Sequence, residues 1–302
     1  MTVLFNKVVI VGVGLIGGSF ALALKHAGAV RQVVGVGRNA SVLARAVELG
    51  IIDRIATSLA DALDGADMVL IATPVAQTGP ILAALAPLLG PHTIVTDAGS
   101  TKSDVVAAAR TALGTRIAQF VPGHPIAGRE VNGPDAALPD LYVDKKTILT
   151  PLPENGAAIV EQVAAAWRAC GAAVHCLAPE QHDRIFAAVS HLPHLLAYAL
   201  VDQIADAPQS DQLFHYAASG FRDFTRIAGS SPEMWRDIAL ANRDALLAEL
   251  ATYGTQIAKL QSLLSKADGA GLEAMFGNAQ RARHAWLSMI EAAERPNRIG
   301  GN

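Results

Sequence analysis

The chain has 302 residues, of which 51% are hydrophobic, 5% aromatic and 17% charged, and its formal net charge is −3 at pH 7. This length suffices for two domains of ordinary size, each with its own core. The small negative charge, without any basic block, argues against a nucleic-acid partner held by phosphate contacts. The two cysteines, Cys170 and Cys176, offer neither a disulfide framework nor a metal site.

The opening MTVLFNK is too short and too polar at its end to act as a secretory signal. Residues 68–96 form a long run without Asp, Glu, Lys or Arg, but four prolines interrupt it. A strand, a helix and a second strand explain this run better than a bilayer span. Because unpaired cysteines also suit a reducing compartment, we expect a soluble, cytoplasmic protein with no membrane partner.

The first half of the chain alternates short apolar runs with helix-length segments. Four runs resemble buried strands, at residues 7–14, 32–38, 67–73 and 93–99. Two further strands are predicted at 145–151 and 172–179, with a helix between them. Near-continuous β-branched strands that alternate with helices predict a doubly wound parallel sheet, covered by helices on both faces.

After about residue 178 the predicted strands stop. Residues 179–205, 231–267 and 272–294 carry apolar residues at the spacing of three and four that marks amphipathic helices. The second segment repeats one apolar face along its length, formed by Leu246, Leu250, Tyr253, Ile257, Leu260 and Leu264. We therefore expect an all-α domain at 178–302, which forms a homodimer and ends in a frayed tail, after an α/β domain at 1–177.

A glycine-rich turn follows the first predicted strand. In GVGLIGG, residues Gly12, Gly14 and Gly17 have the G-x-G-x-x-G spacing, and Leu15 and Ile16 open the next helix. Such glycines allow a tight turn, a close approach to a pyrophosphate and close helix–strand packing, although glycine turns also serve packing alone. The helix N-terminus would face the phosphates. The first domain is therefore expected to be a Rossmann-type dinucleotide-binding domain.

The end of the second strand predicts which dinucleotide binds. An acid about 20 residues after the glycine turn normally holds the ribose 2′-hydroxyl of NAD. Here the chain has Gly37 and Arg38, with no carboxylate before Glu48. An arginine attracts a 2′-phosphate, so we expect NADP to be preferred, with NAD as the alternative. The alternative is that Arg38 is simply a solvated loop residue.

Three polar segments follow strands of the series and so should meet at the carboxyl edge of the sheet, where such folds bind ligands. Thr73 and Pro74 would line the cofactor, and Ser100 would point into the nicotinamide end or cap a helix. His124 lies in GHPIAGRE, whose proline and glycines predict a turn or loop. A loop histidine can be structural or catalytic.

Five segments together resemble the prephenate/arogenate (cyclohexadienyl) dehydrogenase family of tyrosine biosynthesis: GVGLIGGSF, TDAGSTK, GHPIAGRE, VSHLPHLLAYAL and SGFRDFTRIAGSSPEMWRDI. Of these segments, HPIAG and GFRDFTRIA are the ones specific to this family, whereas the glycine-rich turn is widespread. The resemblance runs from about Lys7 to beyond Trp235 and implies a Rossmann domain followed by a helical dimerisation domain.

The resemblance implies oxidative decarboxylation of prephenate, or alternatively of L-arogenate, with hydride transfer to NAD(P)+. His124 would take the ring hydroxyl proton, since an ordinary imidazole pKa of ~6.5 allows proton uptake at neutral pH. Ser100 matches a family serine that hydrogen-bonds near this histidine and the reacting hydroxyl.

The resemblance also implies how the substrate's two carboxylates are held. Arg226 matches an arginine that binds the side-chain carboxylate. Arg222 would pair with Glu130 and so gate the cleft, although both could be ordinary surface charges. Gly220 lies in the same motif. His191 and His194 belong to a segment that faces the family active site, so we expect at least one of them to contact the substrate or cofactor; the alternative is that they are satisfied core histidines.

The sequence departs from the family pattern at Gly37 and Arg38, which replace the strand-two acid, and Arg129 adds a cation beside the catalytic loop. Two other readings remain. A β-hydroxyacid dehydrogenase would need a catalytic lysine in the first helix of the helical domain, where SHLPHLLAYAL has none. A non-catalytic NADP sensor would not need His124, Ser100 and Arg226 to converge.

Overall fold

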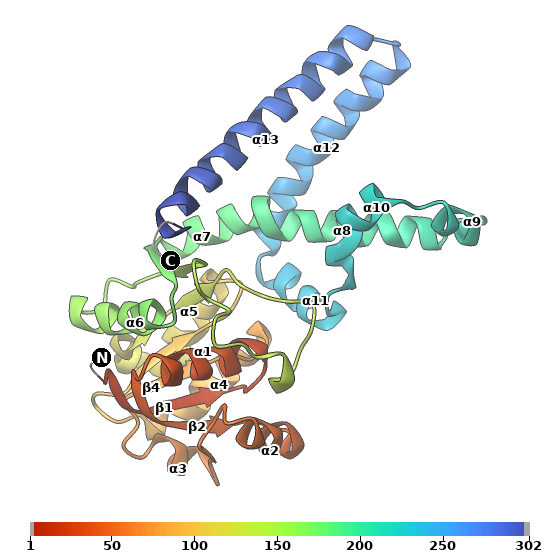
Figure 1. The fold of residues 1–302 in the computed structure, drawn as a ribbon. Coiled ribbons are helices and arrows are strands. Elements are labelled where there is room, and N and C mark those ends of the chain that lie inside the picture. The colour runs from red at the N-terminus through yellow and green to blue at the C-terminus, as the bar shows by residue number, and fades with distance from the viewer. Residues whose placement is uncertain (1–2, 299–302) are drawn as a thin grey trace. The chain divides into compact units, whose positions relative to one another are not determined.

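The computed structural model describes the backbone of residues 3–298 and the side chains of residues 3–290. The chain divides into two compact units, Met1–Leu246 and Leu247–Asn302, which are described separately (Figure 1). The predicted domain boundary at 177/178 falls at the start of a helix within the first unit and stays a prediction.

The first unit is built on a six-stranded, wholly parallel sheet with the strand order β3-β2-β1-β4-β5-β6. Its strands are β1 (Phe5–Val11), β2 (Val30–Val36), β3 (Arg54–Ile55), β4 (Met68–Ile71), β5 (Ile94–Asp97) and β6 (Phe120–Val121). The order reverses between β1 and β4, which is where doubly wound folds open a ligand crevice. The predicted parallel sheet is thus confirmed.

Helices cover both faces of this sheet, and each face has its own core. One core joins the sheet to α1 (Leu15–His26), α2 (Ala40–Glu48) and α6 (Ala157–Ala169), with Phe20 and Trp167 at its centre. The other core joins it to α3 (Leu59–Leu63), α4 (Thr78–Leu85), α5 (Ser103–Leu113) and α11 (Pro232–Ala241). Because both faces are covered, the central stretches of the strands are apolar on both sides, as at residues 8–11 of β1 and throughout β4.

A second, three-stranded sheet lies beside the first and corrects the prediction for His124. It has the order β7-β8-β9, formed by β7 (Gly123–Pro125), β8 (Lys146–Leu149) and β9 (Ala173–Cys176). β7 runs antiparallel to β8, and His124 is paired with Ile148. His124 therefore lies on a short strand, and the expected loop begins only after Pro125, because β8 supplies ladder partners that the local sequence does not reveal.

The helical part of the first unit begins with one continuous helix, Pro179–Ala205, composed of α7 (Pro179–Phe186), a π-helical turn η5 (Ala187–His191) and α8 (Leu192–Ala205). By length and composition alone this helix could cross a membrane, a test that core helices of soluble proteins also pass. The shorter elements of this helical part are α9 (Ser210–His215), α10 (Ser219–Thr225) and the 3-10 turn η6 (Arg226–Gly229). Four further 3-10 turns belong to the preceding α/β part: η1 (Val75–Gln77), η2 (Ala86–Leu88), η3 (Gly114–Gln119) and η4 (Pro134–Ala136).

The predicted helix at 231–267 is divided in two. α11 ends at Ala241, Asn242 breaks the helix, and α12 (Arg243–Ser265) continues into the second unit. The second unit consists of the rest of α12 and α13 (Gly269–Arg298). The predicted frayed tail therefore begins in a helix, and its last four residues lie outside the described part.

Candidate active site

A cavity of about 440 Å³ opens at the carboxyl edge of the parallel sheet. It is lined by the glycine turn after β1, the segments after β4, β5 and β7, and the start of α11. The predicted cofactor residues found in its wall are Gly14, Leu15, Ile16, Thr73, Pro74 and Ser100, and His124 lies in the same wall. Chain segments far apart in sequence are thus brought together as predicted.

The glycine turn has the geometry that a dinucleotide needs. Gly12 has φ +96°, and a Cβ there would lie 2.6 Å from the Ala72 carbonyl oxygen. A Cβ on Gly17 would lie 2.3 Å from the Gly12 carbonyl oxygen, so this glycine permits close helix–strand packing. Gly14 caps α1 and has open space where its side chain would be, on the cavity side. Free N–H groups at this helix end suit a pyrophosphate.

The region of Arg38 lacks the carboxylate that would hold a 2′-hydroxyl. β2 ends at Val36, and Arg38 is exposed without an ion pair to any described residue. The next residue, Asn39, caps α2 by accepting hydrogen bonds from the N–H groups of Ser41 and Val42. Glu48 lies at the far end of α2 and is bound by Arg45. Arg38 is therefore the charged side chain next to the end of β2.

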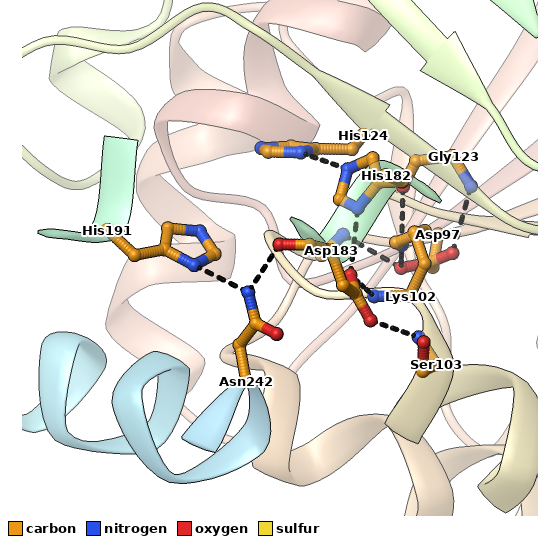
Figure 2. Close-up of polar contacts among 10 residues, drawn as sticks. Asp97, Lys102, Ser103, Gly123, His124, His182, Asp183, His191 and Asn242 are labelled. Atoms are coloured by element: carbon orange, nitrogen blue, oxygen red, sulfur yellow. Dashed lines mark hydrogen bonds and ion pairs between the residues drawn. The ribbon is translucent and has the colours of Figure 1, made fainter. Parts of the chain in front are cut away.

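His124 is hydrogen-bonded to a second histidine that the sequence prediction missed. Its Nδ1 lies 2.8 Å from Nε2 of His182, and His182 Nδ1 lies 2.9 Å from Oδ1 of Asp183. Figure 2 shows the three side chains in a row. His182 and Asp183 come from α7 and are buried, whereas His124 is half-buried. Phe186, one turn along α7, packs edge-on against His124 at 5.0 Å between ring centres.

Asp183 is held as a carboxylate by the start of α5. It accepts hydrogen bonds of 2.8 Å from the N–H groups of Lys102 and Ser103, which are free because α5 begins there. Burial alone would raise the pKa of Asp183, but the hydrogen bonds from His182 and from Ser103 and Lys102 outweigh it and hold the pKa at about 2. Asp183 thus caps α5 in place of Ser100, for which a capping role was considered.

A buried ion pair fixes the backbone next to His124. Lys102 Nζ lies 2.5 Å from Oδ2 of Asp97 and donates a 2.7 Å hydrogen bond to the Gly123 carbonyl oxygen. Oδ1 of Asp97 accepts from the Gly123 N–H at 3.1 Å, and Oδ2 accepts from the Gly99 N–H at 2.8 Å. Both polar groups of the Gly123 backbone are therefore held by one pair of charges (Figure 2).

The surroundings of His124 keep it neutral. Burial is the main cause that lowers the pKa of His124 well below its ordinary 6.5. Repulsion from the positive charges of Lys102 and of His182 and His191 in their protonated forms lowers this pKa further. The ordinary pKa assumed from sequence is therefore corrected downward. A neutral imidazole at neutral pH still has one free nitrogen to accept a proton.

His191 and His194 are not in the wall of the cavity. His191 is buried and its Nδ1 lies 3.1 Å from Nδ2 of Asn242, which also donates to the Asp183 carbonyl oxygen. Burial lowers the pKa of His191 to about 4. His194 stacks on Trp235 with 3.6 Å between ring centres. His191 has the contacts of a satisfied core histidine, the alternative considered for it.

The predicted pairing of Glu130 with Arg222 is wrong. Glu130 instead accepts from Arg226, with 2.5 Å between Oε1 and the guanidinium, and both side chains are more than half exposed. Arg222 is exposed and makes no ion pair with any described residue, because it lies one turn earlier on α10. Gly220 is also exposed on α10.

Arg129 lies in the cavity wall, although the sequence alone did not predict a role for it. Its guanidinium donates a 3.2 Å hydrogen bond to the Ala136 carbonyl oxygen. Ser100 also lines the cavity, yet no hydrogen bond joins it to His124 in the described structure. The sequence held one signal for the missed residues. His182 and Asp183 lie four and three positions before Phe186, which places all three on the side of α7 that is buried.

No group of three or more His, Cys, Asp or Glu residues capable of holding a metal occurs in the described part of the chain. The glycine turn of the Rossmann-type sheet and the half-buried His124 line one cavity. This combination of fold and site defines a dehydrogenase that uses a nicotinamide dinucleotide.

Comparison with known proteins identifies the family. The model of the prephenate dehydrogenase nucleotide-binding domain matches residues 20–176, and that of the prephenate dehydrogenase dimerization domain matches residues 178–278. Cyclohexadienyl dehydrogenase from Zymomonas mobilis is 37% identical over 94% of this chain and 97% of its own length. Prephenate dehydrogenase from Bacillus subtilis is 38% identical over 92% of this chain and 75% of its own length. The chain belongs to the prephenate dehydrogenase family.

Solved structures agree with this assignment. The crystal structure of prephenate dehydrogenase from Aquifex aeolicus with hydroxyphenyl propionate and NAD+ matches with a TM-score of 0.84 and 37% identity, over 95% of this chain and 98% of that one. Arogenate dehydrogenase from Synechocystis matches with a TM-score of 0.79 and 31% identity, over 93% and 99%. These matches confirm the predicted fold, a Rossmann-type domain followed by a helical one.

Proposed function

We propose that this protein catalyses the oxidative decarboxylation of prephenate to 4-hydroxyphenylpyruvate, with hydride transfer to NAD(P)+, in L-tyrosine biosynthesis. The observation that carries the proposal is the position of His124, a neutral histidine in the same cavity wall as the dinucleotide turn. A second candidate is a dual-specificity enzyme that also accepts L-arogenate. It is supported by the relative named cyclohexadienyl dehydrogenase, which this chain matches over nearly its whole length.

In this proposal Gly12, Gly14, Leu15, Ile16 and Gly17 hold the pyrophosphate at the N-terminus of α1. The segments at Thr73–Pro74 and Ser100 line the nicotinamide end. When bound, the nicotinamide supplies the hydride acceptor.

His124 accepts the proton of the ring hydroxyl, and Phe186 packs against the imidazole ring on the protein side.

The substrate's two carboxylates need cations. Arg129 is already in the cavity wall, and Arg226 is held by Glu130 on the segment that borders it. Arg226 begins η6, which packs against α8. We assign one carboxylate to Arg226 and propose Arg129 as the cation for the other, since guanidinium groups bind carboxylates in a bidentate manner.

The test is a matrix of kcat/KM values for prephenate and L-arogenate, each with NAD and NADP. We expect turnover of prephenate, and turnover of both acids if the dual-specificity candidate is right. Because general-base catalysis contributes about 10²- to 10⁴-fold, His124→Gln should lower kcat by that factor and leave dinucleotide binding intact. Absence of turnover on either acid, with intact dinucleotide binding, contradicts the proposal and favours a non-catalytic NADP sensor.

NADP is the proposed preferred cofactor. The support is Arg38, an exposed cation without an ion pair among the described residues, next to a strand end that has no carboxylate. Arg38→Ala should raise the dissociation constant of NADP and leave that of NAD unchanged. Arg31→Ala, an exposed arginine at the opposite end of β2, is the matched control. Equal or tighter binding of NAD, unaffected by Arg38→Ala, contradicts this preference.

A cytoplasmic homodimer formed through the helical domain is also part of the proposal. It is supported by the match to a dimerization domain and by exposed apolar side chains in the second unit, namely Leu264, Phe276, Trp286 and Met289. The two cysteines are unpaired, as expected in a reducing compartment. Sedimentation equilibrium at micromolar concentration should give twice the 31.4 kDa mass of the chain. A monomer under these conditions contradicts it.

A further inference from the structure

His182 and Asp183 have no part in the roles proposed so far, although they are the groups bonded to His124. The chain Asp183–His182–His124 begins at a buried carboxylate and ends in the cavity wall, with links of 2.9 and 2.8 Å. A row of titratable groups with hydrogen-bond distances throughout restricts where each proton can be.

The protons can be placed by elimination from Asp183 outward. Asp183, with a pKa of about 2, is ionised at neutral pH and can only accept, so His182 Nδ1 must carry the proton. Burial first, and then the charge of Lys102, lower the pKa of His182 despite its bond to Asp183, so its ring is neutral and Nε2 has a lone pair. His124 Nδ1 must therefore donate to it.

Of the two ring nitrogens of His124, Nδ1 therefore carries the proton and Nε2 does not. We infer that His182 and Asp183 are positioning residues that hold His124 in its Nδ1–H tautomer, with the lone pair of Nε2 directed at the substrate. The inference rests on the proposed function for its kinetic consequences but not for the tautomer itself.

The tautomer matters because the two nitrogens of a neutral histidine have opposite roles. In the other tautomer Nε2 would present an N–H to the cavity and could not take a proton. The titratable and charged groups around His124 are His182 and Asp183 on α7, His191 further along the same helix, Lys102 and Asp97 behind β7, and Arg129 in the cavity wall. Of these, Asp183 is the carboxylate linked to His124 through the second imidazole, so the chain also stabilises the imidazolium that forms on proton uptake.

The first experiment reads the tautomer directly and needs no substrate. Nitrogen NMR of the full-length protein with ¹⁵N-labelled histidine distinguishes protonated from unprotonated ring nitrogens, and His124→Gln identifies the His124 signals by their loss. We expect wild-type His124 to have a protonated Nδ1 and an unprotonated Nε2 at pH 7. A proton on Nε2, or a doubly protonated ring, overturns the inference whatever the substrate of the enzyme is.

The second experiment breaks the chain at each link. Asp183→Asn can donate to His182 and so reverse both imidazoles; we expect the other tautomer at His124 and a loss in kcat of about 10²- to 10⁴-fold, with dinucleotide affinity within about twofold of wild type. His182→Leu should also lower kcat, whereas His182→Gln keeps an acceptor for Nδ1 and should recover part of it. His175→Gln, an exposed histidine on β9, is the control and should change neither.

The variants also separate positioning from folding. Asp183 caps α5, so Asp183→Asn is compared only if its circular dichroism and melting match a folded protein; the two His182 variants leave that cap in place. Equal kcat values and an unchanged tautomer in His182→Leu overturn the inference. Inactivity of wild type on both acids contradicts the proposed function alone, because the NMR result stands separately.

Discussion

Two ion pairs in the first compact unit have the same chemistry and opposite surroundings. The Asp97–Lys102 pair is fully buried behind the strand of His124 and holds the Gly123 backbone at both its N–H and its carbonyl. The Arg226–Glu130 pair is more than half exposed and holds no backbone. A buried pair is costly to break because the remaining charge loses its partner, whereas an exposed pair contributes little and exchanges partners readily.

The buried and the exposed ion pair therefore have different roles in the site. The buried pair holds the backbone next to His124, the proposed base, in the absence of substrate. The exposed pair contributes little, so in the proposed function Arg226 would exchange Glu130 for a substrate carboxylate at small cost. Buried, hydrogen-bonded groups therefore fix the backbone next to His124, whereas the cation of the exposed pair is held by Glu130 alone.

The largest expected effect comes from breaking the buried pair. Lys102→Met leaves Asp97 buried without its cation and should lower the free energy of unfolding by about 3–5 kcal/mol, measured by urea denaturation. Because Gly123 also loses a donor, kcat should fall. A change below about 1 kcal/mol would contradict the difference drawn between the two pairs.

The pH dependence of the wild-type enzyme gives the next effect. His124 must be unprotonated to accept a proton, so kcat/KM rises with pH through its pKa, and that pKa lies well below 6.5. We expect kcat/KM to stay level through neutral pH and to fall only at pH values well below 6.5. A fall that is centred at or above 6.5 would show that burial and the nearby cations do not act as described.

Removing the exposed cation should affect binding more than chemistry. Arg226→Ala should raise KM for prephenate about 10- to 100-fold, because a hydrogen bond to a charged group is worth about 1.5–3 kcal/mol. The free energy of unfolding should hardly change. Arg222→Ala is the matched control, an exposed arginine one turn away without an ion pair among described residues. Equal KM changes in both variants would contradict the assignment of Arg226.

Glu130→Gln should give the smallest effect. Loss of an exposed pair changes the free energy of unfolding by no more than about 1 kcal/mol, as measured by urea denaturation. The released Arg226 no longer has a competing carboxylate, so KM for prephenate should stay the same or fall. A clear rise in KM would mean that Glu130 positions Arg226 rather than competes for it.

Periodicity and spacing predicted most of the fold. The four long parallel strands, the glycine turn and the helical second half were found because each depends on residues close together in the chain. Short strands were harder to predict. β7 has three residues, including a proline, and becomes a strand only because β8 lies beside it. The break at Asn242 was missed for a related reason, since its side chain bonds to Asp183 and His191 on another helix.

For the site, the sequence by itself determined which residues share the carboxyl edge of the sheet, because parallel strands end together there. It thus placed Gly14, Ser100 and His124 around one cavity. Only the tertiary structure decided the partners of these residues. The contact of His124 with His182, the two hydrogen bonds that hold the Gly123 backbone and the pairing of Glu130 with Arg226 instead of Arg222 join residues 21 to 96 positions apart. Their geometry depends on how α5, α7 and the α10–η6 segment pack, which no local pattern records.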